Sequence, residues 1–378
     1  MSEKDKTAIK KKRFDKILLL VTLLLVAYGT AMVISAGSAY AEVKYGDAMY
    51  FVKRQIIWLA LGLVAMLVAS KIDVKHIKMV SIPLYIVTLA LLFLTLVIGF
   101  TGNGAQRWIS IGPLTIQPSE IAKLAVVVIL AYYFDKNERR ASSSIGRESF
   151  IYGTMLPLGL ILIPILLVML QKHLSCIIIL GLIGVLLILF AGVRVRYIAG
   201  FIGIGALGIS ALALFTDYTK DRITVWLDPE KYKLTGGWQT LQGLMAIGSG
   251  GFFGKGYGMS ELKHLYVSEP ANDMIFAILC EELGLVGATL ALALFACLIY
   301  RGFRIATSTR DTYQRILCLG VSCQIAIQVL LNVAVVTNTI PNTGISLPFF
   351  SYGGSSLVML LFEIGLILSV SRDAKIGK

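Results

Sequence analysis

The chain is 378 residues long, and 57% of these residues are apolar while only 15% are charged. Its mean hydropathy is +0.79. Soluble proteins are about half apolar and a quarter charged, so this composition excludes a soluble globular protein. The net charge of +13 falls in short segments between apolar runs, which is typical of cytoplasmic loops and disfavours a nucleic-acid partner. The composition predicts a single transmembrane domain over residues 1–378.

The chain opens with a basic tail, residues 1–16, and continues in an apolar run over 17–36. A signal peptide has an apolar core of only about 7–15 residues, so we expect an uncleaved first transmembrane helix. Runs of about 20 residues, the length that spans a bilayer, recur along the chain. They predict an all-α polytopic membrane protein with ten spans, at 17–38, 52–70, 77–99, 119–135, 151–170, 174–192, 197–216, 273–299, 314–338 and 355–371.

The distribution of basic residues predicts the orientation of these spans. An even number of spans places both termini on one side, and about two-thirds of the lysines and arginines fall in the segments of that side. Because such residues are enriched in cytoplasmic loops, both termini are expected in the cytoplasm. The outer segments 100–118, 217–272 and 339–354 are rich in Gly, Pro, Asn and Trp. We therefore expect the chemistry to face outward, with the largest outer loop, 217–272, between spans seven and eight.

That large loop contains a glycine-rich stretch, Gly248–Gly258, of the kind that surrounds phosphate with backbone N–H groups. A nucleotide-binding P-loop is not supported, because Ser249 stands where a glycine is needed and Gly256 replaces the Ser or Thr after Lys255. The alternative is a flexible loop at the membrane surface.

Carboxylates occur at and below the start of the eighth span. Asp273 directly precedes an apolar run, where it either complements the helix dipole or serves as a general base. Glu281 and Glu282 follow about 12 Å deeper in the same helix, where an unpaired charge is costly. They need partners, which points either to contacts between helices or to a polar transport path.

Further polar residues fall near the fourth, ninth and tenth spans. Arg107 and Trp108 lie in an outer segment, and Glu120 and Lys123 follow in the first turns of the fourth span. Trp108 is either a membrane-interface residue or a platform for a sugar, and Lys123 either extends to the interface or binds a ligand. Three amides, Gln324, Gln328 and Asn332, share one face of the ninth span, and the tenth span holds one acid, Glu363. These residues predict either interhelical hydrogen bonds or a polar cavity.

The last outer loop, 341–356, places two prolines and three glycines at membrane depth. Such a backbone either lines a cavity or forms a re-entrant turn. The five cysteines lie in apolar runs, and the three histidines, His76, His173 and His264, are too scattered to predict a metal site.

Three segments together resemble one family. They are Gly-Ala-x-Arg-Trp-Ile followed by Gln-Pro-Ser-Glu-x-x-Lys at 104–123, Asn-Asp-Met-Ile-Phe-Ala followed by Glu-Glu-Leu-Gly at 272–284, and Leu-Pro-Phe-Phe-Ser-Tyr-Gly-Gly-Ser-Ser at 347–356. The chain resembles the SEDS proteins, which include FtsW, RodA and SpoVE, over nearly its whole length. The resemblance implies an enzyme of the bacterial cytoplasmic membrane that polymerises lipid II into peptidoglycan strands together with a class B penicillin-binding protein.

The resemblance also implies roles for single residues. Asp273 matches the essential aspartate of the family, Arg107 and Trp108 match its first outer-loop motif, and four further residues match more loosely: Glu120, Lys123, Lys255 and Ser351. The glycine-rich loop and the basic tail look closer to the FtsW and SpoVE branch. One departure is clear, since many members read Gln-Pro-Asp-Leu-Gly-Thr where this chain has Gln171-Lys-His-Leu-Ser-Cys176.

Polymerisation of a lipid-linked sugar needs a base for the acceptor hydroxyl and positive charge for the departing lipid pyrophosphate. We expect Asp273 to be the base, Arg107, Lys255 or Lys263 to meet the pyrophosphate, and Trp108 to bind a sugar face. A divalent cation could share the phosphate charge, although no protein cage for one is visible. Two alternatives remain open: a lipid II flippase that uses Glu281, Glu282 and the ninth-span amides, and a non-catalytic scaffold for the penicillin-binding protein.

Overall fold

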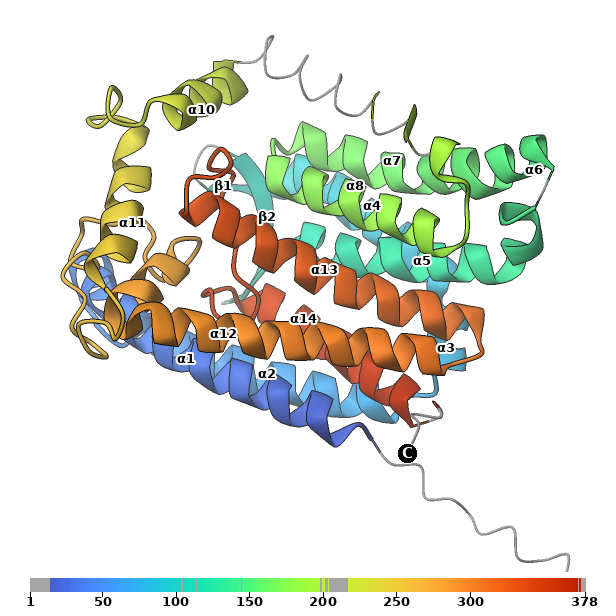
Figure 1. Ribbon diagram of the computed structural model, residues 1–378, viewed down its shortest axis with the longest axis horizontal. Helices are drawn as coiled ribbons and strands as arrows, with labels where there is room; N and C mark the ends of the chain where they lie inside the picture. The colour runs from blue at the N-terminus through green and yellow to red at the C-terminus, as the bar shows by residue number, and fades with distance from the viewer. Residues whose placement is uncertain are drawn as a thin grey trace, which may run out of the picture.

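The computed structural model describes residues 14–102, 105–112, 114–143, 145–197, 199–200, 203, 217–372 and 374. It is a bundle of long helices that run roughly side by side, with a small sheet and two further helices at one end (Figure 1). In chain order its main elements are α1 (Lys16–Tyr45), α2 (Tyr50–Lys71), α3 (Val74–Met79), α4 (Ser81–Ile98), β1 (Phe100–Gly102), β2 (Ala105–Ile111), β3 (Leu114–Ile116), α5 (Pro118–Ala141), α6 (Gly146–Phe150), α7 (Leu156–Leu170), α8 (Leu174–Phe190), α10 (Asp217–Leu227), α11 (Gly237–Ser249), α12 (Ile275–Ser308), α13 (Thr312–Val336) and α14 (Gly354–Ser371).

Most of the predicted spans coincide with helices of this bundle. Within the described residues, seven helical segments are long and apolar enough to cross a membrane: α1, α2, α4, the stretch from α6 through α7, α12, α13 and α14. The predicted fourth and sixth spans correspond to α5, whose second half is charged, and to α8, which has 17 residues. The predicted seventh span, 197–216, lies almost wholly outside the described residues.

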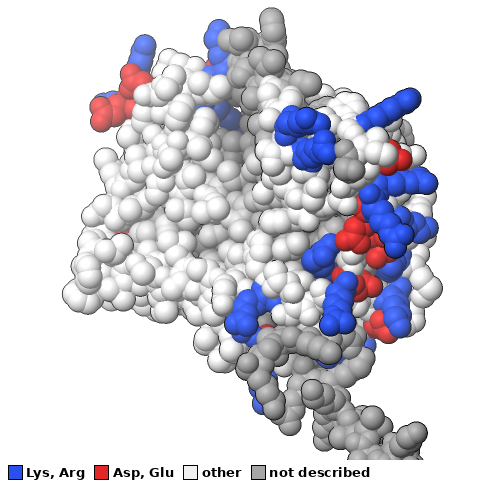
Figure 2. All heavy atoms as spheres, turned by 45° about the vertical axis from the view of Figure 1, so that its right-hand side comes forward, with Lys and Arg blue, Asp and Glu red and all other residues white. Residues whose placement is uncertain are grey.

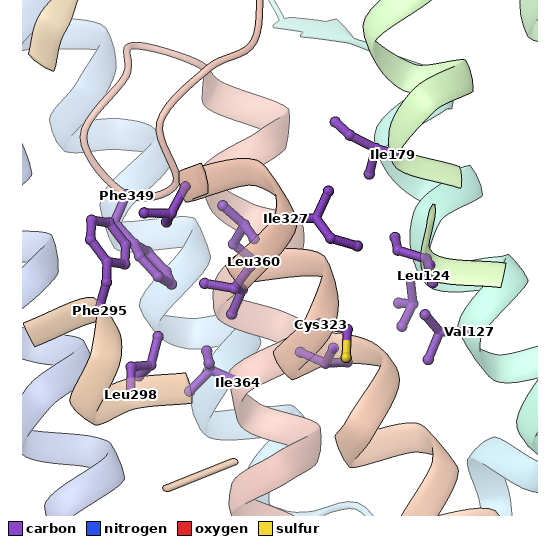
Figure 3. Close-up of a cluster of buried hydrophobic side chains, with 14 of the residues drawn as sticks. Leu124, Val127, Ile179, Phe295, Leu298, Cys323, Ile327, Phe349, Leu360 and Ile364 are labelled. Carbon is purple, nitrogen blue, oxygen red and sulfur yellow. The ribbon is translucent and has the colours of Figure 1, made fainter. Parts of the chain in front are cut away.

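The core of the bundle forms around α13. Buried residues make up 78% of the apolar window of α13 but only 28% of those of α2 and α4, so α13 is central and the other two are peripheral. Its side chains Cys323 and Ile327 lie among apolar residues of α5, α8, α12 and α14 (Figure 3). The pair α2 and α14 packs most extensively, because a glycine in each, Gly62 and Gly365, lets the two helices approach closely.

The end of the bundle that carries β1 and β2 in Figure 1 holds structure that the prediction of an all-α protein missed. The three short strands form an antiparallel sheet in the order β1-β2-β3, in which Phe100 pairs with Trp108 and Ile109 with Ile116. The long predicted loop 217–272 contains the helices α10 and α11. Short strands and short helices are not visible in a pattern of long apolar runs.

Charged side chains gather at the opposite end of the bundle. Figure 2 shows a broad face almost without charge, and many lysines and arginines near the end where α3 and α6 lie. There the start of α1 is joined to the end of α14, since the Asp15 N–H donates to Ser371 Oγ over 3.1 Å. The buried Asp15 carboxylate also accepts a hydrogen bond from Arg301 near the end of α12. Three helices from distant parts of the chain therefore meet at Asp15.

Candidate active site

Asp273 lies just before α12, where the loop 337–353 folds against it. Asn332 of α13 donates from Nδ2 to the Asp273 carbonyl (2.9 Å) and to the Ile345 carbonyl (2.6 Å). Ser351 Oγ donates to the Asn272 carbonyl over 2.7 Å. Asn332 and Ser351 thus fix the backbone of Asp273 to the loop 337–353.

Asp273 is half-buried as a residue, and the Oδ1 atom of its carboxyl group is shielded from solvent. Its Oδ2 atom accepts one long hydrogen bond, 3.5 Å, from Gln239 Nε2 of α11, and within the described part of the chain its buried Oδ1 atom has no hydrogen-bond partner. Burial raises the pKa of this carboxyl to about 7, and the neighbouring Glu269 carboxylate adds to the rise, while Gln239 and Arg222 oppose it. A carboxylate with a pKa near neutrality is suited to accept a proton.

A turn over residues 342–344 forms one wall beside Asp273. Gly344 has a φ of 69°, a conformation that favours glycine, and an added Cβ atom would lie 3.6 Å from Asp273 Oδ2. Arg222 of α10 donates from Nη1 to the Asn342 carbonyl of this turn. Sequence analysis did not single out Arg222, although an arginine in an outer segment rich in glycine was a signal for it.

A second arginine, Arg107 of the β-sheet, is connected to this turn through the start of α8. Ser175 at the start of α8 donates from Oγ to the Thr343 carbonyl, and Arg107 of β2 donates to the Lys172 carbonyl three residues earlier. Trp108, the next residue of β2, is half-buried. Ser351 therefore bonds to the residue before Asp273 and Arg222 to the adjacent turn, whereas Arg107 is connected to that turn through residues 172–175.

Glu120 and Lys123 form a separate buried pair within the bundle. Lys123 Nζ lies 2.8 Å from Glu120 Oε2, and both side chains are almost fully buried. Nearby, Gln324 donates from Nε2 to both carboxyl oxygens of Glu363, at 3.0 and 2.8 Å. Gln324 and Asn332 thus make hydrogen bonds between elements, as the first of the two predicted alternatives requires.

His173, which stands where many family members have an aspartate, is buried between α7 and α8. Its Nδ1 atom lies 3.3 Å from Ser119 Oγ. Burial, aided by the charges of Arg107 and Lys123, lowers the pKa of this imidazole to about 3. A neutral ring therefore occupies the position.

Lys255 and Lys263 do not face Asp273 but form ion pairs with the two glutamates of α12. Lys255 Nζ lies 2.9 Å from Glu281 Oε1, and Lys263 Nζ lies 2.9 Å from Glu282 Oε1. Lys263 is 4% exposed and also donates to Ser35 Oγ of α1. This arrangement departs from the expectation that either lysine meets a pyrophosphate, because two buried carboxylates need countercharges more strongly.

The described residues contain no group of three or more His, Cys, Asp or Glu placed to hold a metal ion. Besides Arg222, sequence analysis missed two polar neighbours of Asp273, namely Gln239 and Glu269. Gln239 comes from α11, whose folding back onto α12 no sequence pattern revealed, whereas Glu269 precedes Asp273 by only four residues.

The helices and the buried acid define a polytopic membrane protein with a candidate general base at one end of its bundle. Comparison with known proteins identifies the family. The profile of the FtsW/RodA/SpoVE family, which is described as "cell cycle protein", matches residues 15–376. The chain belongs to this family, and it is a multi-pass protein of the bacterial cytoplasmic membrane.

Individual relatives agree with this assignment. Stage V sporulation protein E of Bacillus subtilis (strain 168) is 40% identical over 97% of this chain and 99% of its own length. A probable peptidoglycan glycosyltransferase FtsW of Geobacter sulfurreducens is 37% identical over 96% of each chain.

Solved structures show the same fold. A chain from a peptidoglycan synthase complex that coordinates polymerisation and crosslinking superposes with a TM-score of 0.80 and 28% identity, covering 95% of this chain and 98% of that one. The rod shape determining protein RodA of Thermus thermophilus gives a TM-score of 0.70 at 28% identity, over 96% of this chain and 97% of that one.

Proposed function

We propose that this chain is a peptidoglycan glycosyltransferase that joins lipid II units into glycan strands at the outer face of the cytoplasmic membrane. The glycosyltransferase activity is supported by the names of FtsW relatives at 35–37% identity. The observation that carries the proposal is the carboxyl of Asp273, with a pKa of about 7, beside a turn to which Arg222 donates a hydrogen bond.

In the proposed reaction, Asp273 accepts the proton of the acceptor sugar hydroxyl. The hydroxyl oxygen forms a bond to the anomeric carbon of the donor with inversion, and the bond from that carbon to the lipid pyrophosphate breaks. The pyrophosphate leaves with the bonding electron pair, and Arg107 and Arg222 stabilise its charge. Trp108 offers a flat apolar surface for a sugar ring.

The proposed topology has ten spans, including 197–216, with both termini in the cytoplasm. It places Asp273 outside, where the sugars of the substrate would lie while its lipid tail stays in the bilayer. The lysines and arginines near α3 and α6 then face the cytoplasm, as such residues do in most membrane proteins (Figure 2). Likeness to a chain of a peptidoglycan synthase complex supports a class B penicillin-binding protein as the partner.

The test compares the native chain with Asp273→Asn, each purified with its penicillin-binding partner and supplied with lipid II. We expect the variant to lose at least about 100-fold of its polymerisation rate, because asparagine cannot accept the proton. Asp47→Asn is the matched control, since Asp47 forms an exposed ion pair with Lys53 after α1. Equal polymer from native and Asp273→Asn protein would refute the role of Asp273. Polymer from neither would favour the flippase or the scaffold.

A further inference from the structure

Helix α12 is interrupted at Gly284, well inside the membrane-spanning bundle. Gly284 has a φ of 63° and a ψ of −162°, a combination that only glycine adopts readily, whereas its neighbours continue the helix. An added Cβ atom would lie 2.4 Å from the Gly254 nitrogen and 2.6 Å from the Phe252 carbonyl oxygen. The glycine-rich segment 250–256 therefore lies directly against the break, while side chains such as Phe252 and Phe253 remain exposed.

Backbone N–H groups on one side of the break donate to this segment. The Leu285 N–H donates to the Gly251 carbonyl over 3.0 Å, and the Val286 N–H donates to the Phe252 carbonyl over 3.1 Å. In an unbroken α-helix these two N–H groups would bond to the carbonyls four residues earlier, those of Glu281 and Glu282.

Those two carbonyls are bonded to the same segment. The Glu281 carbonyl accepts from the Lys255 N–H over 2.9 Å, and the Glu282 carbonyl accepts from the Gly256 N–H over 2.9 Å. Segment 250–256 thus takes the place of two helical hydrogen bonds. It accepts hydrogen bonds from the two N–H groups and donates hydrogen bonds to the two carbonyls. We refer to residues 281–286 together with segment 250–256 as the α12 joint.

This exchange of partners gives α12 two arrangements in which its backbone is satisfied. With the segment inserted, all four groups are paired as described, and without it the two bonds from Leu285 to Glu281 and from Val286 to Glu282 can re-form. Lipid does not tolerate unpaired backbone groups, so each arrangement must provide partners for all four of them. An element with two satisfied states is a basis for a conformational switch.

The Lys–Glu pairs hold the joint in its inserted state. Lys255 and Lys263, on the inserted segment and just after it, pair with Glu281 and Glu282, which precede the break. Ser260 Oγ adds a hydrogen bond of 2.5 Å to Glu281. If the segment left, both buried carboxylates would lose their countercharges, which is strongly unfavourable.

The joint is connected to Asp273 through α11. The end of α11 packs on α12 so closely that a Cβ atom at Gly250 would lie 1.9 Å from the Cys280 carbonyl oxygen. The start of α11 carries Gln239, which bonds to Asp273, and the outer part of α12, residues 275–283, lies between Asp273 and the break.

We propose that the α12 joint is a two-state device that positions Asp273, and that Lys255, Lys263, Glu281 and Glu282 are positioning residues that favour its inserted state. The effect of the joint on activity rests on the function proposed above. The existence of the joint does not rest on that function, because the two states differ in backbone hydrogen bonds that can be measured without substrate.

The first test is hydrogen–deuterium exchange, at residue resolution, of the full-length chain with Gly284→Ala. A methyl group at Gly284 blocks insertion, so the amides of Lys255 and Gly256 should exchange at least about tenfold faster. The amides of Leu285 and Val286 should stay protected, because they regain their helical partners. Gly248→Ala is the control, since an added Cβ atom there meets nothing within 4 Å. Unchanged exchange at Lys255 and Gly256 in folded Gly284→Ala protein would overturn the proposal.

A second variant covers the case in which Gly284→Ala does not fold. The double change Lys263→Met with Glu282→Gln removes one ion pair without leaving a lone buried charge. We expect the same pattern of exchange, together with a lower polymerisation rate and an altered pH profile while partner binding is retained. A double variant with native exchange and a native pH profile would refute the positioning role. An altered exchange pattern in a chain whose native form does not polymerise lipid II would support the existence of the joint and refute only the proposed function.

Discussion

Asp273 is placed so that it can both hold and release a proton near neutral pH. Burial removes water from its carboxyl group, and Glu269 repels the charged form, so that its pKa rises to about 7. As a base, Asp273 acts in its deprotonated form. The rate of polymerisation at low substrate should therefore increase as the pH rises through about 7.

The contribution of Glu269 can be tested with Glu269→Gln. This change removes the repelling charge but keeps an oxygen that can accept the bond from Asn272 Nδ2, which is 2.6 Å long in the native protein. The pKa of Asp273 should fall, and the rising limb of the pH–rate profile should move to lower pH. Glu230→Gln, at an exposed position of the same long segment, should leave the limb in place. A limb unmoved by Glu269→Gln would show that burial alone sets this pKa.

Among the residues of the site, sequence could identify Asp273 but not its surroundings. A lone carboxylate before an apolar run, in a segment that resembles a family motif, is visible in the chain itself. Arg222 and Gln239 reach the surroundings of Asp273 because α10 and α11 fold back, which depends on tertiary contacts, whereas Glu269 is only four residues away in the sequence. Lys255 and Lys263 were predicted as ligands for pyrophosphate because their partners, Glu281 and Glu282, were not known to face them.

At the scale of elements, the turn between α7 and α8 has a backbone conformation that excludes proline at position 172. Lys172 has a φ of 54°, and its N–H donates to the Met169 carbonyl over 3.0 Å. Proline, which many SEDS proteins resembling this chain have here, fixes φ near −65° and has no N–H group. The turn of this chain must therefore differ from a turn that contains proline.

We expect Lys172→Pro to destabilise the protein by about 3 kcal/mol, because it conflicts with both the backbone angle and the hydrogen bond. Lys172→Gly should be neutral or slightly stabilising, since glycine adopts a positive φ without strain. Thermal unfolding of the two variants in the same detergent measures the difference. Equal midpoints would show that the turn rearranges at little cost.

Sequence predicted the long elements better than the short ones. Apolar runs of about 20 residues located α1, α2, α12, α13 and α14, because membrane thickness imposes a length that is easy to recognise. The strands β1 and β3 have only three residues each, and α11 is too mixed in composition to show such a signal. The break at Gly284 was missed for another reason, since a single glycine in an apolar helix has many possible roles.

At the scale of the whole molecule, the buried pair of Arg301 and Asp15 joins three helices. The Asp15 side chain is 1% exposed, so Arg301→Leu would leave an unpaired buried carboxylate at a cost of about 3–5 kcal/mol. The double variant Asp15→Asn with Arg301→Leu should recover most of this loss. Lys53→Leu, which breaks an exposed pair, should change stability by about 1 kcal/mol or less. Thermal unfolding midpoints that are equally low for the single and double variants would contradict this account.

The contact between Asp15 and Ser371 also has a consequence for biogenesis. Helix α1 leaves the ribosome and enters the bilayer first, yet the hydrogen bond to Asp15 comes from the end of α14, and α2 packs chiefly on α14 as well. Until α14 has been synthesised and inserted, α1 and α2 lack those contacts and must be held by lipid or by the insertion machinery. A nascent chain that stops before α14 should consequently be recognised by membrane proteases as unfinished, even though its earlier spans are already in place.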